Sequence, residues 1–247
     1  MINLAIALAA GVASWLLTTL VTDSLWAGLL PFLVLFPGLF IFLGRKTNRR
    51  IEAVVEEAQK QMMQVQNART PSQREGMLEK AIDILKKGYA YQHHQFLVGA
   101  QLNAQIGQLY YLQKKFDEAR PYLEKSYRRN GVAVAMLACL HYMKKRYDEM
   151  EKVFARALKD NPKESLLWNL YAWCQWKRGQ SDTAMKVLNR GLEKLKDDER
   201  IKGNLEALQN NKKMKMRGWK EMWYQFHLEA PPQPKPQIDR RAMFRGR

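Results

Sequence analysis

The side chains that most often bind metals or act as nucleophiles are few in this sequence. His93 and His94 are adjacent, so on a helix they would point about 100° apart and could not form the i, i+4 ligand pair of a metalloprotease. His141 and His227 are each isolated along the chain. The sequence has no glycine-rich phosphate loop, no nucleophile elbow and no pair of acids in an apolar setting. We therefore expect no catalytic residue, no metal and no cofactor, and the protein is not predicted to be an enzyme.

The cysteine content agrees with this interpretation. Cys139 and Cys174 are the only cysteines, and both lie within segments of helical apolar spacing. Two cysteines supply neither a disulfide framework nor a four-cysteine metal site. A reducing compartment is compatible with this content.

Basic and aromatic residues are interleaved towards the C-terminus, an arrangement that can bind a membrane, nucleic acid or a protein groove. The basic run 212–217 is followed by Trp219, Trp223, Tyr224, Phe226 and His227. No nucleic-acid-binding motif accompanies these residues. Trp219, Trp223 and Phe226 fall at i, i+4 and i+7, which is one face of a helix and favours docking onto the last repeat of the helical segment that precedes them.

The formal net charge of +17 implies attraction to an anionic partner, which could be lipid headgroups, nucleic acid or an acidic protein. The charges are unevenly distributed. The first 44 residues contain no lysine or arginine and one acid, Asp23, whereas the remainder carries all 41 basic residues. The chain therefore divides into an apolar anchor, 1–44, and a polar body long enough to bury a core.

Two apolar stretches, 2–21 and 25–43, are each long enough to cross a hydrocarbon core of about 30 Å as a helix. The short polar turn between them favours a transmembrane helical hairpin, because a lipid-exposed backbone must satisfy its own hydrogen bonds. Pro31 and Pro37 are expected to kink the second helix. Neither stretch contains Lys, Arg, Glu or His, so we expect an anchor rather than an ion pathway.

A basic cluster follows the second stretch directly, at Arg45, Lys46, Arg49 and Arg50. The positive-inside rule places such a cluster on the cytoplasmic side. This predicts a multi-pass protein of the bacterial inner membrane, with its N-terminus and its body in the cytoplasm. One alternative is a signal peptide, although the usual basic n-region is missing. Another is a single span with a re-entrant partner, since the turn is short and the second stretch contains prolines.

Beyond residue 50 the apolar residues recur with helical spacing, so the body is predicted to be all-α. Related segments recur at intervals of 31 and then 34 residues, and a period near 34 marks one helix-turn-helix unit. These segments read Ile106-Gly107-x-x-Tyr110, Leu137-Ala138-x-x-His141 and Trp168-x-x-Tyr171-Ala172. The pattern resembles the tetratricopeptide repeat (TPR) family, in which small residues let paired helices approach each other.

The resemblance implies an α-solenoid. The body then divides into a degenerate helix pair over 45–99, three TPR-like repeats over 100–196, a cap over 197–228 and a tail over 229–247. Helices over 51–68 and 76–87 form the degenerate pair, with a capping box from Ser72 to Glu75 at its join. A polar helix over 198–216 closes the last apolar face of the stack. The tail is predicted to be a proline-rich linker with a mobile basic end.

In TPR folds the first helix of each pair lines a concave groove. The resemblance places a peptide-binding groove here at Gln101, Gln108, Tyr111, Tyr142, Asn169, Trp173 and Trp176. Family members that grip a C-terminal carboxylate use Lys and Arg with Asn at such places, and only Asn169 matches. The aromatic side chains instead suit an apolar or amphipathic peptide. The alternative is that these rings form the core between repeats.

A second regularity is electrostatic. The turns between the two helices of successive repeats carry Lys114, Lys115, Lys144, Lys145, Arg146, Lys177 and Arg178. Stacking would align these residues along one edge, which could contact the anionic cytoplasmic leaflet. The alternative is a solvated edge that aids solubility.

These observations predict a membrane-anchored cytoplasmic TPR adaptor that binds a partner protein or peptide and recruits it to an inner-membrane assembly. One alternative is a structural subunit of a multi-component membrane machine. The other is binding of nucleic acid or anionic lipid through the basic edge and tail, of which nucleic acid is the less expected partner.

Overall fold

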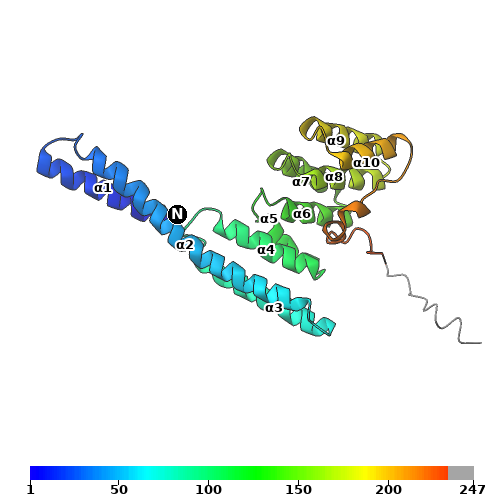
Figure 1. Ribbon diagram of the computed structural model, residues 1–247, viewed down its shortest axis with the longest axis horizontal. Coiled ribbons are helices and arrows are strands. Elements are labelled where there is room, and N and C mark those ends of the chain that lie inside the picture. Colours follow the sequence, from blue (N-terminus) through cyan, green and yellow to red (C-terminus); the bar gives the residue numbers. More distant parts are fainter. Residues whose placement is uncertain (233–247) are drawn as a thin grey trace, which may run out of the picture.

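The computed structural model describes residues 1–232, and most of the predicted linker and tail, 233–247, lies outside the described residues. Residues 1–232 contain helices, turns and loops but no β-strand, so the predicted all-α fold is confirmed. Figure 1 shows a long hairpin at one end and a stack of helix pairs at the other. In chain order the helices are α1 (Ile2–Thr22), α2 (Leu29–Val65), α3 (Pro71–Lys87), the 3-10 helix η1 (Gly88–Tyr91), α4 (Val98–Leu112), α5 (Phe116–Glu124), α6 (Gly131–Met143), α7 (Tyr147–Asp160), α8 (Ser165–Lys177), α9 (Ser181–Lys194), α10 (Glu199–Gln209), the 3-10 helix η2 (Arg217–Trp219) and α11 (Glu221–Tyr224).

The hairpin consists of α1 and the first part of α2. Both helices are long and apolar enough to cross a membrane, and few of the side chains in their apolar stretches are buried within the protein. A Cβ at Gly11 would lie 3.0 Å from atoms of Phe32 and Phe36, so this glycine allows the two helices to approach closely. The hairpin therefore presents apolar side chains outward, as a membrane anchor must.

The second helix of the hairpin does not end at residue 44, where the sequence predicts the boundary between anchor and body. It passes through Pro37 and ends at Val65, a length of about 55 Å at 1.5 Å per residue. The Asn3 side-chain amide donates to the Thr47 hydroxyl over 2.8 Å, which aligns the start of α1 with this point of α2. Anchor and body therefore share one helix.

In the region predicted to hold a degenerate pair, the last part of α2 packs against α3. The N-cap of α3 is Thr70, whose hydroxyl accepts from the Gln73 backbone N–H over 3.2 Å. The predicted capping box from Ser72 to Glu75 is therefore wrong. The cap comes earlier because Pro71, with its fixed φ and no N–H, already occupies the first helical turn.

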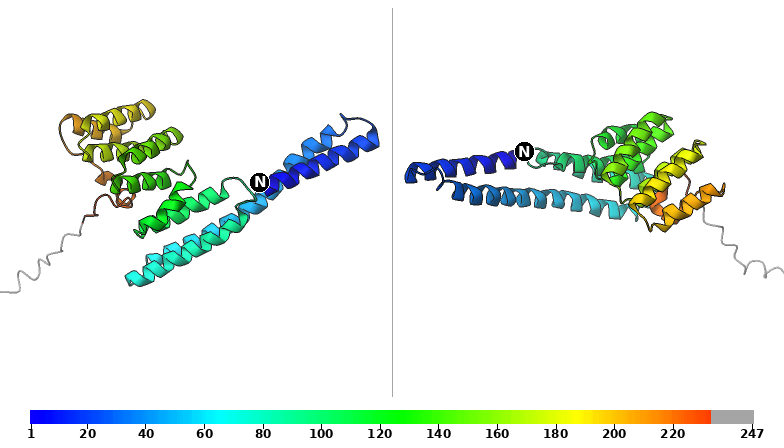
Figure 2. Two further views of the ribbon diagram at one scale, coloured as in Figure 1. Left: turned by 180° about the vertical axis from the view of Figure 1, so that it is seen from behind. Right: turned by 90° about the horizontal axis from the view of Figure 1, so that it is seen from above.

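The three repeats are the pairs α4–α5, α6–α7 and α8–α9, and α10 covers the end of the stack. The first helices of successive pairs also contact one another, α4 with α6, α6 with α8, and α8 with α10. They form a continuous inner face, as expected for a solenoid. The predicted capping helix is shorter than 198–216, because it ends at Gln209. Figure 2 shows that the hairpin extends away from this stack.

Two glycine substitutions test the helix packing with opposite expected signs. Gly107→Ala should destabilise the protein by about 1–3 kcal/mol, because a Cβ would lie 2.8 Å from a Leu123 methyl group and 3.1 Å from the Leu123 backbone nitrogen. Gly203→Ala should stabilise it by about 0.5–1 kcal/mol, since alanine favours a helix interior and a Cβ there would meet no described neighbour within 4 Å. Urea unfolding monitored by circular dichroism measures both changes, and effects of the same sign would contradict this packing.

Candidate peptide-binding groove

The inner face of the stack is largely covered by the protein's own C-terminal segment, residues 212–228. After α10 the chain turns back beside α6 and α8 (orange in Figure 1). Five apolar side chains of this segment are buried: Met214, Met216, Trp219, Trp223 and Phe226. The segment belongs to the same hydrophobic core as the three repeats.

Aromatic contacts hold the segment on α8 and α4. Trp223 and Phe226 are fully buried, and the Trp223 indole packs edge-on against Trp173 with ring centroids 5.1 Å apart. The Tyr111 hydroxyl donates to the Phe226 carbonyl oxygen over 2.7 Å. The His227 ring stacks on Tyr111 at 5.6 Å. Tyr111 and Phe226 lie 115 positions apart in the sequence, so the segment closes over the stack from its last helix to its first repeat.

A buried amide network fixes the start of the segment. The Asn204 amide donates to the Asn169 side-chain oxygen over 2.7 Å, and the Lys215 backbone N–H donates to the Asn204 side-chain oxygen over 2.6 Å. The Asn169 amide in turn donates to the Ser165 carbonyl oxygen over 2.9 Å. Asn169 is fully buried in this network, so its side chain is not free to bind a peptide carboxylate.

The segment does not have the single helix that its aromatic spacing predicts. Trp219 ends η2, Lys220 has a left-handed φ of 49°, and Trp223 belongs to the short α11. This turn re-aims the chain, so the aromatic side chains reach different helices of the stack. The prediction that the segment docks onto the last repeat is therefore incomplete, because the segment also contacts α4 in the first repeat.

The predicted groove residues fall into three groups. Tyr111, Asn169 and Trp173 lie beneath the C-terminal segment and are buried. Tyr142 and Trp176 are half-buried beside it, where the Lys177 ammonium lies 5.0 Å from the Trp176 ring centroid. Only the third group, Gln101 and Gln108, lies on a part of the inner face that the segment leaves open, as described below.

Burial shifts the pKa values of three titratable side chains near the segment towards their uncharged forms. It lowers the pKa of the His227 imidazole below its ordinary value of 6.5, with a smaller contribution from the Lys114 charge, so the ring is neutral at pH 7. Burial also raises the pKa of the Cys139 and Cys174 thiols well above 9.0. Reactive cysteines need an accessible thiolate at neutral pH, which neither thiol provides.

An open groove remains between α2 and α4. One pocket of about 310 Å³ is lined by Ala58, Gln59, Met62, Leu85, Gln105, Gln108, Leu109, Leu112 and Asn130. A second, of about 520 Å³, is lined by Asn48, Ile51, Glu52, Val55, Glu56, Gln59 and Gln101. Both pockets include Gln59, so they continue each other along the two helices. We call this surface the α2–α4 groove.

The α2–α4 groove combines an apolar floor with amide side chains. Met62 and Leu112 remain 37% and 39% exposed, and the Gln108 amide donates to the Asn130 side-chain oxygen over 3.0 Å. Apolar side chains can bind those of a peptide, while carboxamides both donate and accept hydrogen bonds from its backbone. This arrangement suits an amphipathic segment of a partner.

The predicted basic edge lies at the end of the repeats that faces away from the hairpin. Lys115 contacts the start of α3, and α3 begins next to the end of α2 farthest from the apolar stretches. Several of the predicted residues are also paired with acids of the body: Lys115 with Glu75 and Glu79, Lys144 with Asp117, and Arg178 with Glu151. This position and pairing count against a contact between the basic edge and the leaflet around the hairpin.

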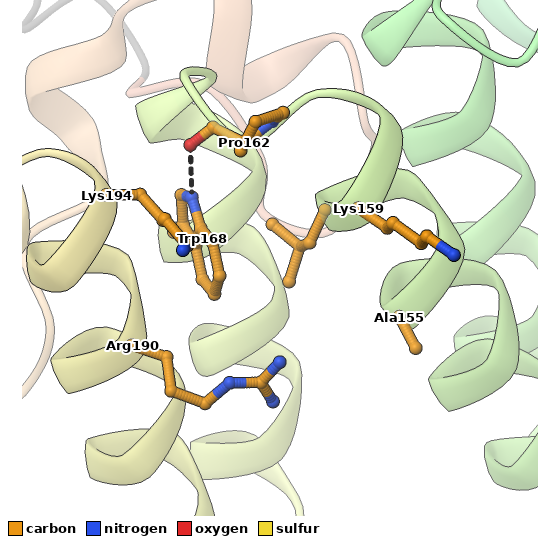
Figure 3. A pocket seen from close by; sticks show the side chains of 7 residues that line it. Ala155, Lys159, Pro162, Trp168, Arg190 and Lys194 are labelled. Carbon is orange, nitrogen blue, oxygen red and sulfur yellow. Dashed lines mark hydrogen bonds between the residues drawn. The ribbon is translucent and has the colours of Figure 1, made fainter.

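A further pocket, which sequence reasoning missed, lies on the outer face between α7, α8 and α9 (Figure 3). It measures about 530 Å³ and is lined in part by Lys159, Arg190 and Lys194. The Trp168 indole forms one wall and donates to the Pro162 carbonyl oxygen over 3.0 Å. Such a site suits an acidic group next to an apolar one. No motif reveals it, because its cations come from two different helices.

Comparison with known proteins agrees with the helix pairing. A tetratricopeptide repeat family model matches residues 110–173 and 141–208, which span α5 to α9 together with α10 and the last part of α4. No curated protein and no solved structure matches the chain significantly. The matched residues fold as helix pairs with the small residues at their contacts, and the chain is therefore a TPR-containing protein.

Proposed function

We propose that this protein is a membrane-anchored scaffold that binds a partner protein along the α2–α4 groove. TPR repeats are protein-interaction modules, and the observation that carries the proposal is the continuity of α2. The same helix forms the second arm of the apolar helical hairpin and one wall of the open groove. A partner bound there would be held next to the membrane at a high local concentration.

The open groove is a better partner site than the covered inner face. Each large apolar side chain of the C-terminal segment contributes roughly 1.5–3 kcal/mol by burial, before the entropy cost of ordering is subtracted. A partner peptide would have to displace these side chains to reach Tyr111 or Trp173. Met62 and Leu112 are accessible without any displacement.

The membrane that best fits the chain is the bacterial inner membrane, with the repeats in the cytoplasm. The basic residues Arg45, Lys46, Arg49 and Arg50 follow the apolar part of α2 and are exposed, and such clusters stay on the cytoplasmic side. Recruitment of the partner to an assembly in this membrane is the function we infer.

Partner capture from the full-length protein in mild detergent tests the proposal. In a Met62→Asp/Leu112→Asp variant, recovery of a bound partner should fall by about tenfold or more, because a carboxylate in an apolar contact costs at least 1.4 kcal/mol. The matched control is Met222→Asp, which changes an apolar side chain 51% exposed on α11. A photo-crosslinker at position 112 should label the same partner directly.

The opposite result would be a partner recovered equally with both variants and not crosslinked from position 112. The α2–α4 groove would then not be the binding site. Equal loss with both variants would point instead to a general effect of the added charge.

A further inference from the structure

The loop after η1 lies at the open end of the hairpin, although about 90 residues separate it from the N-terminus. The Met1 ammonium and the Ile2 backbone N–H both donate to the His93 carbonyl oxygen over 2.8 Å. The Asn3 backbone N–H donates to the His94 carbonyl oxygen over 3.2 Å. Figure 2 shows the N-terminus beside the chain that leads into α4. These bonds place the loop at the level where α1 begins.

This loop exposes two large apolar side chains. Phe96 is 53% exposed and Leu97 is 50% exposed. Leu97 also has a left-handed φ of 68°, a conformation that is rare for a bulky residue. Its carbonyl oxygen accepts from the Gln101 backbone N–H over 2.8 Å, so the start of α4 fixes the strained residue. A strained residue that the surrounding structure holds in place, next to an exposed aromatic side chain, is a candidate for a functional role.

Basic side chains lie on the part of α2 that is level with the start of α1 and with this loop. The bond between Asn3 and Thr47 aligns the first turn of α1 with residue 47, so Arg45, Lys46 and Arg49 lie within one helical turn of this level. All three are exposed, and none of them forms an ion pair with an acid of residues 1–232. The Arg50 guanidinium lies 5.9 Å from the Tyr91 ring centroid, which connects the cluster to η1.

We propose that Phe96, Leu97 and this basic cluster form a binding site for anionic phospholipid at the membrane surface. The apolar pair enters the boundary between headgroups and acyl chains, where amphipathic and aromatic residues concentrate. The arginines and Lys46 bind the lipid phosphates, to which an anionic leaflet attracts basic residues. The site rests on the proposed anchoring and adds a third membrane contact, which would fix the orientation of the α2–α4 groove relative to the bilayer.

Nitroxide labelling of the full-length protein in vesicles tests this site. Both native cysteines are fully buried, so a label attaches selectively to a cysteine introduced as Phe96→Cys, Val12→Cys or Met222→Cys. Position 12 reports insertion of the hairpin, and position 222 reports the solvent. In vesicles of phosphatidylethanolamine and phosphatidylglycerol, a label at position 96 should be about tenfold less accessible to a polar nickel complex than one at position 222, since polar solutes avoid the acyl boundary.

Each outcome has a distinct meaning. The anionic lipid site would be supported if the labels at positions 12 and 96 are both shielded in the anionic vesicles. The shielding at position 96 should then decrease in vesicles of phosphatidylcholine alone, and also in the Arg45→Gln/Arg49→Gln variant. Shielding at position 12 but full exposure at 96 would overturn the site and leave the anchor intact. Equal shielding at 96 in both vesicle types would overturn the role of anionic headgroups. Exposure at position 12 would overturn the anchoring and this site with it.

Discussion

Trp223→Ala is expected to lower the free energy of unfolding by about 3–5 kcal/mol, the usual cost of removing a buried tryptophan. Trp223 is fully buried, contacts Trp173 edge-on and donates its indole N–H to the Glu229 carboxylate over 3.0 Å. Alanine would leave a cavity between the C-terminal segment and α8. The measurement is urea unfolding of the full-length protein in detergent, monitored by far-ultraviolet circular dichroism.

The matched control for Trp223→Ala is Met222→Ala, one residue earlier in the same short helix. Met222 is 51% exposed, so its replacement should change the free energy of unfolding by about 0.5 kcal/mol or less. If the two substitutions had similar small effects, the C-terminal segment would not be packed on the inner face in solution. The inner face would then be available to a partner, as the sequence predicts.

Deletion of residues 2–43 is expected to convert the protein from a membrane-bound to a soluble form. The deletion removes α1 and the apolar first part of α2, the two stretches long and apolar enough to span a bilayer, and a membrane-spanning helix makes insertion effectively irreversible. Fractionation of cells followed by alkaline carbonate extraction measures the change. The full-length protein should remain in the pellet, and the shortened protein should appear in the supernatant.

Two measurements make the deletion result interpretable. Circular dichroism of the shortened protein should retain the helical signal of the repeats, because their core is separate from the hairpin. The intact mass of the full-length protein isolated from membranes separates an anchor from a cleaved signal peptide. Carbonate-resistant sedimentation of the shortened protein would place the membrane attachment elsewhere in the chain.

The repeat architecture could be predicted from the sequence because its determinants are local. Small residues such as Gly107 and Ala138 recur at the spacing of one helix pair, and the structure confirms that Gly107 allows contact with Leu123. The hairpin is equally local, since its signal is the length of two apolar stretches. Both features depend on residues that are close in the sequence.

The features that sequence reasoning missed depend on distant residues or on a change of composition within one helix. The composition changes at residue 44, where the apolar stretch ends, but nothing in that change ends α2. The hydrogen bond from Tyr111 to Phe226 joins residues 115 positions apart, which no periodicity reveals. The spacing of Trp219, Trp223 and Phe226 fits one helix, yet the positive φ of Lys220 interrupts the helical conformation between Trp219 and Trp223. Sequence reasoning therefore did not reveal that the chain's own C-terminal segment covers Tyr111, Asn169 and Trp173 of the predicted groove.

The uninterrupted course of α2 has a geometric consequence for any partner. An α-helix rotates by about 100° and advances by about 1.5 Å with each residue. One residue inserted between the apolar stretch and Ile51 would therefore rotate the groove by about 100° around the axis of α2, relative to the apolar hairpin. Seven inserted residues, about two turns, would nearly restore the direction while raising the groove by about 10 Å. The number of residues in α2 between the apolar stretch and Ile51 therefore sets the direction in which the groove faces relative to the hairpin.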